Sequence, residues 1–346
     1  MVIRSLVQPA AVVVTALLTG ALILALSGHN PVSVYREMAE RVLLRRSGLE
    51  ESVIAMSPVL LAAIAAWIAS RIGMWNIGID GQIVAGAVVA GALAPQLDVL
   101  PAWMMWLVVT VAGMAAGALW ALAPGLLRVR SGVNEIVTTI MTIYVAFSLA
   151  SWLIKGVLND ATMVAPATPI VEVARRLPEI GATRMHAGVV VAIALSIFVW
   201  ATGRWTAAGI LSRVVGEAPR AAGRIGVPVD RYVLTGFLLS GAVAALAGVS
   251  EVIAVRGSVQ ADWRPSYGLA AFAVLFLARK SAVGLIPAAF LLGMFGYAST
   301  VAPRSTGVAP DFFPMLEGLI LIFLALAAWR GFATHRNAEG VVGARS

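Results

Sequence analysis

Ten apolar stretches follow one another along the chain, and this succession constrains the fold more than any other feature. A helix needs about 20 predominantly apolar residues to cross the hydrocarbon core of a membrane. The stretches lie near residues 9–27, 53–70, 75–95, 103–126, 134–154, 186–203, 232–255, 267–278, 283–301 and 313–330. Because 60% of the 346 residues are hydrophobic and 12% are charged, the chain lacks the charge that covers a soluble globule. We predict an all-α polytopic membrane protein with about ten transmembrane helices, within a range of eight to ten.

Two of the stretches predict irregular spans. The third, near 75–95, contains many glycines and polar groups, so we expect a broken or re-entrant segment there. The eighth, near 267–278, has the length of a half-helix. No polar region is large enough for a soluble domain. We therefore expect a single transmembrane domain over residues 1–346, with the first stretch retained as a helix and a short polar tail, 331–346, that is disordered.

Basic residues indicate the orientation of the chain. Arginine and lysine are enriched in short cytoplasmic loops of membrane proteins. The short connections 127–133 and 279–282 are basic and contain no acid, whereas the long connections 28–52 and 155–185 mix both charges. This pattern favours cytoplasmic termini. It also explains the net charge of +8 through topology, without nucleic acid as a partner.

One sizeable connection, 204–231, is predicted on the cytoplasmic side. Within it we expect a short helix over Glu217–Gly223, bounded by Gly216 and by Gly226-Val227-Pro228. Several arginines surround this alanine-rich helix. The pattern favours a docking element, and the alternative is an ordinary solvated basic loop.

The sequence has few residues that could carry out chemistry. It contains no cysteine and three histidines, which excludes thiolate catalysis and leaves little for a metal centre. The phosphate-binding loop, the zinc-protease motif, the nucleophile elbow and the dinucleotide fingerprint are all absent. We predict a chain with no catalytic residue, no metal and no cofactor of its own.

Polar groups at membrane depth are the candidate functional residues, because such groups normally face the bundle interior or a watery cavity. The first set is Trp75, Asn76, Asp80 and Gln82 in the glycine-rich third stretch. We expect these residues to line a pathway. The alternative is a glycine-rich packing face, with Asp80 at the start of a helix near the interface.

The second set opens the fifth stretch. Asn134, Thr138 and Thr142 repeat every four residues and so form one polar stripe on a helix, with Glu135 and Thr139 beside it. We expect this stripe to face a cavity or another helix. The alternatives are a helix cap for Asn134 and threonine hydroxyls bonded to the preceding turn.

Three segments together resemble a known family. NIGIDGQ, VNEIVTTIM and VVGEAPRAAGRIGVPVDR resemble membrane permease subunits of bacterial ATP-binding-cassette (ABC) importers. The branch is the ribose/branched-chain amino acid permease superfamily, and within it the nucleoside permeases paired with basic membrane lipoproteins. The resemblance extends from about residue 50 to 300, in the family's order.

The resemblance implies a type II importer permease fold in the bacterial inner membrane. The segment 216–226 then corresponds to the helix that couples to the ATPase, with Gly216, Glu217, Arg220, Ala221, Ala222 and Gly226 at the docking site. Asn76, Gln82, Asn134 and Glu135 match positions near the translocation path. The implied partners are two ATPase subunits that bind the ATP, a second permease (the same chain or a different one), an external solute-binding lipoprotein and membrane lipid.

This chain departs from the family pattern at several positions. The family usually has Glu at the position of Asp80 and Asn at that of Ala218, and it often has Leu-Asn at the position of Thr142-Ile143. The segment 277–284 lacks the family's first Gly and its Pro. These differences leave the identity of the solute open.

We expect a non-catalytic permease subunit that imports a small polar solute. A nucleoside or related base is the first candidate, and a simple sugar is the second. The rival from another class is an ion-coupled secondary transporter with Asp80, Glu135 and Glu251 as a relay, since polar residues on interrupted helices also suit that design.

Overall fold

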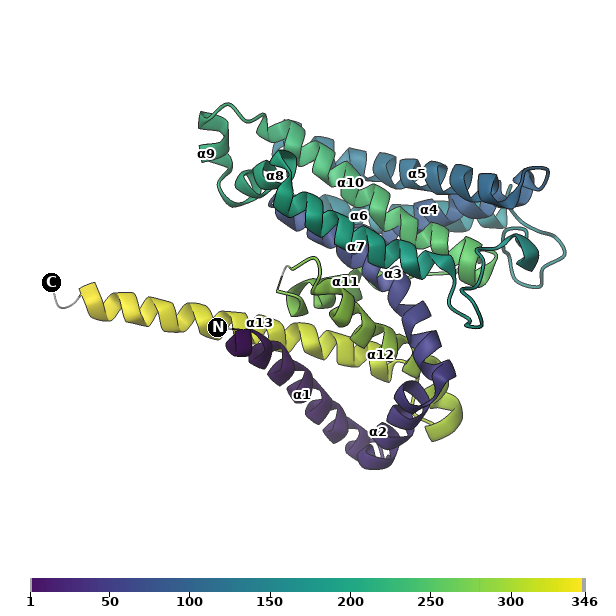
Figure 1. Cartoon of the computed structure of the whole chain (residues 1–346), viewed down its shortest axis with the longest axis horizontal. Helices are drawn as coiled ribbons and strands as arrows, with labels where there is room; N and C mark the ends of the chain where they lie inside the picture. Colours follow the sequence, from purple (N-terminus) through teal and green to yellow (C-terminus); the bar gives the residue numbers. More distant parts are fainter. Residues whose placement is uncertain (1, 280, 344–346) are drawn as a thin grey trace. The chain divides into compact units, whose positions relative to one another are not determined.

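The computed structural model describes residues 2–279 and 281–343, which are mainly helical (Figure 1). The α-helices are α1 (Val2–Leu26), α2 (Pro31–Ala39), α3 (Arg46–Arg71), α4 (Ile79–Leu93), α5 (Ala102–Ser131), α6 (Glu135–Lys155), α7 (Ala187–Trp205), α8 (Ala207–Glu217), α9 (Pro219–Arg224), α10 (Val229–Ser250), α11 (Tyr267–Leu277), α12 (Leu285–Thr306) and α13 (Phe312–Gly343). Two π-helical segments, η1 (Glu40–Leu44) and η4 (Glu251–Arg256), and two 3-10 turns, η2 (Ala94–Leu97) and η3 (Val173–Arg175), complete the described structure.

Every predicted apolar stretch coincides with a helix, which confirms the all-α polytopic fold. Seven of the described helices are long and apolar enough to cross a membrane: Pro9–Leu26, Arg46–Arg71, Ala102–Ser131, Glu135–Lys155, Ala187–Trp205, Val229–Arg256 and Leu285–Thr306. The apolar part of α13, Phe312–Ala327, is shorter. Helix α4 has 15 residues and α11 has 11, so the expectations of a broken third span and a half-helix are both confirmed.

Helices α4, α5 and α10 pack closely against one another within residues 53–293, one of two compact units of the chain (Figure 1). Their small residues explain the close packing. A Cβ atom on Gly117 would lie 2.3 Å from the Gly241 carbonyl oxygen, and one on Gly86 would lie 2.4 Å from the Ala245 carbonyl oxygen. Such distances leave room for glycine alone, as expected for helices that associate through small residues in a membrane.

The second compact unit comprises residues 1–52 and 294–346. Here α1 packs against α13, and a Cβ atom on Gly20 would lie 2.6 Å from a side-chain carbon of Leu316. The Tyr35 hydroxyl donates to the Leu17 carbonyl oxygen at 2.8 Å, which joins α2 to α1. The sequence predicted a loop over residues 28–52. Its cap-and-proline signature, Asn30-Pro31, starts helix α2, and the Asn30 side chain accepts hydrogen bonds from the backbone N–H groups of Val32 and Ser33.

Helix α13 continues to Gly343, beyond its apolar part, which ends at Ala327. The prediction of a disordered tail over 331–346 stays a prediction. Residues 344–346 lie outside the described residues. The prediction of a single domain over 1–346 stays a prediction.

The long connection 156–186 folds back on the segment that follows α10, at the opposite end of residues 53–293 from α8 and α9 (Figure 1). Backbone hydrogen bonds join Thr168 to Val259, Val171 to Gly257 and Leu177 to Ile253, at 3.0, 2.8 and 2.8 Å. Arg175 donates to the carbonyl oxygens of Leu97 and Leu100, at 2.8 Å each. These bonds satisfy backbone groups that have no helix to pair them.

Candidate functional site

The predicted pathway residues Asn76 and Gln82 form a buried amide pair. The Asn76 amide donates to Gln82 Oε1 at 2.8 Å, and the Gln82 amide donates back to Asn76 Oδ1 at 3.1 Å. Both side chains are 1% exposed. Asn76 also donates to Ser240 Oγ at 2.9 Å, and the Ser240 hydroxyl donates to the Ala65 carbonyl oxygen at 2.7 Å.

This network joins the break before α4 to α10 and α3. A buried polar network is stable only when its members are hydrogen-bonded, and these groups bond one another. Ser240 was missed at the sequence level, since a single serine in a span rich in alanine and glycine is a weak signal. Whether Asn76 and Gln82 meet a solute stays a prediction.

Asp80 lies at the first turn of α4 and contacts the first turn of α11. Its Oδ1 accepts a hydrogen bond from the Gly268 backbone N–H at 2.8 Å. Ser266, the residue before α11, makes no side-chain cap of its own. The Asp80 carboxylate therefore caps α11 from another helix, where a negative charge is favourable.

Trp75 makes a second link to α11. Its ring lies 6.1 Å from that of Phe272 and 5.8 Å from that of Phe276, between centroids. These are the distances of attractive tilted aromatic pairs. Trp75 and Asp80 thus bind the short helices α4 and α11 into one assembly.

The polar stripe of α6 divides between two environments. Asn134 is exposed and caps the helix, because its side chain accepts a hydrogen bond from the Ile136 N–H at 2.8 Å. Thr138 and Thr142 are half-buried, and their hydroxyls bond to carbonyl oxygens of the preceding turn. These three residues match the capping and back-bonding alternatives in their contacts, and a pathway role for them stays a prediction.

Glu135 and Thr139 occupy the buried face of α6. Glu135 is 7% exposed, and its Oε2 lies 3.5 Å from Arg128 Nε. Thr139 is fully buried beside the break, where a Cβ atom on Gly78 would lie 3.1 Å from its Cβ. The two residues that lay beside the predicted stripe are therefore the ones closest to the protein interior.

Glu251 starts the π-helical segment η4 and is the buried member of an ion pair whose other member, Arg256, is 41% exposed. Its Oε2 lies 2.7 Å from Arg256 Nε, and the Tyr267 hydroxyl donates to its Oε1 at 3.0 Å. Arg256 also lies over the Trp263 ring, at 5.0 Å from its centroid. Glu251 was a candidate from the sequence, but its partners were not predicted, because a π-helical turn changes the spacing at which residues meet. The three acids of the alternative relay therefore have different partners. Asp80 accepts from the Gly268 N–H, Glu135 lies beside Arg128, and Glu251 pairs with Arg256.

The predicted coupling segment consists of two helices instead of one. Helix α8 ends at Glu217, Ala218 leaves the helical conformation with φ −145° and ψ 67°, and Pro219 begins α9. The expected helix over Glu217–Gly223 is thus wrong at its start, since a proline disfavours helical geometry in the residue before it and fits the first position of a new helix. The predicted end is correct: Gly226 follows α9 with φ +82°.

The six residues predicted to couple to the ATPase lie on different sides of this segment. Gly216 faces the end of α3, where a Cβ atom would lie 2.3 Å from the Arg71 carbonyl oxygen and 2.7 Å from the Gly73 nitrogen. Ala222 is fully buried within the chain. The other four, Glu217, Arg220, Ala221 and Gly226, are exposed. These four have the most surface to offer a partner, whereas Gly216 is half-buried.

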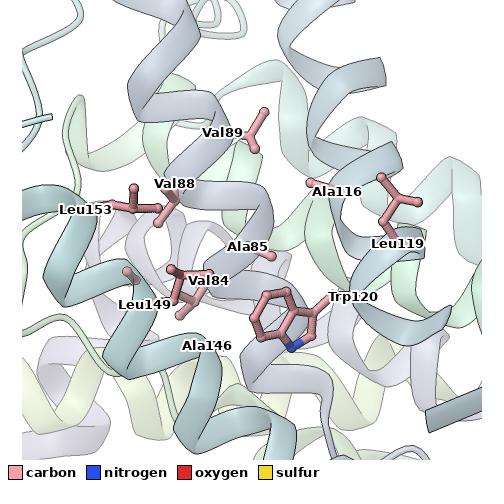
Figure 2. A pocket seen from close by; sticks show the side chains of 11 residues that line it. Val84, Ala85, Val88, Val89, Ala116, Leu119, Trp120, Ala146, Leu149 and Leu153 are labelled. Carbon is pink, nitrogen blue, oxygen red and sulfur yellow. The ribbon is translucent and has the colours of Figure 1, made fainter. Parts of the chain in front are cut away.

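An apolar pocket of about 310 Å³ lies between α4, α5 and α6 (Figure 2). Figure 2 shows aliphatic side chains and Trp120 around it. The Trp120 indole N–H donates to the Thr142 carbonyl oxygen at 3.3 Å, which leaves no polar group to orient a solute. Among the described residues, no group of three or more His, Cys, Asp or Glu could hold a metal ion.

Comparison with known proteins identifies a matching family and several similar proteins. Residues 48–325 match the family model described as "Branched-chain amino acid transport system / permease component". A glucose ABC transporter permease of Haloferax volcanii is 29% identical over 327 residues, which cover 91% of this chain and 86% of the relative. A guanosine ABC transporter permease of Bacillus subtilis is 28% identical over 334 residues, covering 92% and 93%. A nucleoside ABC transporter permease of Lactococcus lactis is 26% identical over 335 residues, covering 93% and 91%.

Proposed function

The chain belongs to the family of branched-chain amino acid transport system permease components, and we propose that the solute it imports is a nucleoside or related base. It is a permease subunit of an ABC importer, a multi-pass membrane protein that catalyses no reaction itself. The single observation that carries the solute is the similarity, over more than nine-tenths of the chain, to permeases named for guanosine and nucleosides.

An ABC importer permease works with an ATPase and a solute-binding protein. In our proposal the complex holds two permeases, either two copies of this chain or this chain with a different one, and two ATPase subunits. The external binding protein is a lipoprotein. This chain has no phosphate-binding loop, so it needs no cofactor and the ATPase binds the ATP.

The pathway in this proposal runs past Trp75, Asn76, Asp80, Gln82, Asn134, Glu135, Thr138 and Thr142. Amides suit a nucleoside, because each side chain offers both donors and acceptors to base edges and ribose hydroxyls. In the conducting state the amides of Asn76 and Gln82 exchange their mutual hydrogen bonds for bonds to the solute. Trp75 supplies an aromatic surface for the base.

The energy enters through α8 and α9. The exposed residues Glu217, Arg220, Ala221 and Gly226 contact the ATPase, and movement of the segment passes through Gly216 to the end of α3. The orientation that goes with this coupling puts both termini in the cytoplasm and the connection 156–186 outside, in the bacterial inner membrane.

A simple sugar is the second candidate solute. The observation that favours it is the sequence identity of 29% to a permease named for glucose, over 91% of this chain. A ribose-bearing solute and a free sugar share hydroxyl groups, so the same amides serve both.

Uptake by proteoliposomes tests the proposal. The complex of this chain with its ATPase and binding protein is reconstituted, and radiolabelled guanosine and glucose are offered separately. ATP-dependent accumulation of guanosine, competed by other nucleosides, is the expected result. Accumulation of glucose alone replaces the first candidate by the second. Uptake driven by an ion gradient without ATP contradicts both and favours the secondary transporter with Asp80, Glu135 and Glu251.

A further inference from the structure

A polar cavity of about 570 Å³ lies at the end of α3, next to the coupling segment. Arg71 and Trp75 line it from the α3 end and the break before α4, Arg213 and Glu217 from α8, and Arg279 from the turn after α11. It is separate from the buried amide pair and from the apolar pocket. Neither the proposed pathway nor the docking face uses its arginines.

The charges around this cavity do not balance. Three arginines and one glutamate line it, which leaves a net charge of +2. Arg213 Nε lies 2.7 Å from Glu217 Oε1, but the two side chains are 60% and 66% exposed, so solvent weakens the pair. Arg213 also repels Arg71 electrostatically, and the attraction of Arg71 to Glu217 is a smaller effect. An anion in the cavity relieves this repulsion.

The cavity lies at the level where apolar helices end. Helix α3 ends at Arg71, and α11 ends at Leu277, two residues before Arg279. Helix α7 ends close by, because the Arg71 guanidinium donates to the Gly203 carbonyl oxygen at 3.1 Å. Trp205, the last residue of α7, is 68% exposed, as is typical of tryptophans at a membrane–water interface.

The backbone of Arg279, in the turn after α11, is unusual. Its φ is +51°, and no other non-glycine residue among those described has a positive φ. Arginine has no particular preference for this conformation, in which asparagine and glycine are common. The turn nevertheless carries a guanidinium on the lining of the cavity.

We propose that this cavity binds a phosphate group, supplied by the headgroup of an anionic phospholipid or by a soluble phosphate compound. Guanidinium groups form planar forks that match phosphate oxygens, and a phosphate offers more acceptors to three such forks than a carboxylate does. Basic pockets between transmembrane helices at the membrane surface bind anionic headgroups. The bound phosphate bridges the end of α3, α8 and the turn after α11, and so holds the coupling segment against the spans.

Lipid retention tests the proposal directly. The full chain with its ATPase partner is purified in detergent and titrated with dioleoyl-phosphatidylglycerol or dioleoyl-phosphatidylcholine, and bound lipid is counted by native mass spectrometry. A parallel arm measures thermal unfolding in inorganic phosphate against chloride at equal ionic strength. The variants are Arg279→Asn, which removes the charge and suits a positive φ, and Arg213→Gln, which removes an exposed charge. Arg130→Gln, an exposed arginine at the end of α5, is the matched control.

We expect each cavity variant to weaken phosphatidylglycerol binding about tenfold, the effect of losing one charge-assisted hydrogen bond, while Arg130→Gln has no effect. Stabilisation of the unaltered chain by inorganic phosphate, lost in both variants, with no preference between lipids, assigns the site to a soluble phosphate. The proposal is overturned if neither phosphatidylglycerol nor phosphate is preferred, or if both variants bind like the unaltered chain. It is also overturned if the variants keep lipid binding but lose the ATPase, since the cavity then receives an acidic group of that partner.

Discussion

Asn76 and Gln82 hydrogen-bond to each other in both directions, at 2.8 Å and 3.1 Å, across the point where the chain turns into α4. The pair places two amides in the interior of a membrane protein, and each amide donates a hydrogen bond to the other. It also explains how a short, broken span is held in place, because Asn76 continues the network to Ser240 on α10. The same amides that stabilise this state are the groups that a polar solute needs.

The amide pair predicts a strong energetic coupling between its two members. Asn76→Ala leaves Gln82 without its partner in a buried site, and we expect a loss of about 1–3 kcal/mol in the free energy of unfolding. Gln82→Ala has a similar effect, and the double variant loses less than the sum, because the second change removes a group that is already unpaired. Denaturation of the detergent-solubilised chain measures the cycle. Strictly additive losses contradict the pairing.

Asp80 predicts a difference between loss of charge and loss of an acceptor. Asp80→Asn keeps an oxygen for the Gly268 N–H, so most of the stability of α11 remains. Asp80→Ala removes the acceptor and costs about 0.5–2 kcal/mol, the usual effect of deleting a helix cap. Thermal unfolding measures both. Equal destabilisation by the two variants shows that the charge, rather than the cap, is what α11 requires.

The start of α6 predicts an effect on transport. Asn134→Ala and Glu135→Ala reduce solute uptake while assembly with the ATPase stays intact, because both changes remove polar groups of the proposed pathway. Asn134→Ser is the control, since serine keeps the helix cap and removes the amide. Uptake by proteoliposomes is the measurement, with co-purification of the ATPase as the check on assembly. Normal uptake by Asn134→Ser together with loss in Asn134→Ala reduces Asn134 to a cap.

Two glycines of the coupling segment make a matched pair. Gly216→Ala places a methyl group 2.3 Å from the Arg71 carbonyl oxygen, whereas a Cβ atom on Gly223 meets nothing within 4 Å. We expect Gly216→Ala to cost about 1–3 kcal/mol through overpacking and to lower solute-stimulated ATP hydrolysis. Gly223→Ala is neutral, or stabilising by about 0.5–1 kcal/mol, since alanine favours a helix. Equal activities of the two variants contradict a coupling route through Gly216.

The exposed face of α9 predicts the docking surface. Ala221→Trp hinders contact with the ATPase by its bulk, while Ala221 itself is exposed and leaves the spans unaffected. Arg220→Gln costs less, about 0.2–1 kcal/mol of binding, the usual contribution of an exposed ion pair. ATP hydrolysis stimulated by binding protein and solute is the readout. Full stimulation with Ala221→Trp would falsify the docking assignment.

The sequence was sufficient to predict where helices cross the membrane and where they are interrupted. Hydrophobic length is a local property, and a lipid environment requires every backbone group in a span to bond within its own helix. The break before α4, the half-helix α11 and the end of α9 shortly before Gly226 follow from glycine, proline and span length alone. The start of α9 could also have been predicted from the sequence, because Pro219 is a local signal for a new helix.

The partners of the polar residues required the tertiary structure. Asp80 meets Gly268 and Asn76 meets Ser240, and in each case the two residues lie more than 160 positions apart. No period or motif encodes such a distance. The burial of Ala222 and the exposure of Ala221 depend likewise on which side of a six-residue helix faces the rest of the chain.

The sequence by itself therefore determined the class of the protein, its helices and the residue types available for chemistry, because each depends on composition and near neighbours. The tertiary structure alone decided which amides, carboxylates and arginines meet. Those contacts arise when small residues let α4, α5 and α10 approach closely, and close packing of distant segments is a property of the whole fold.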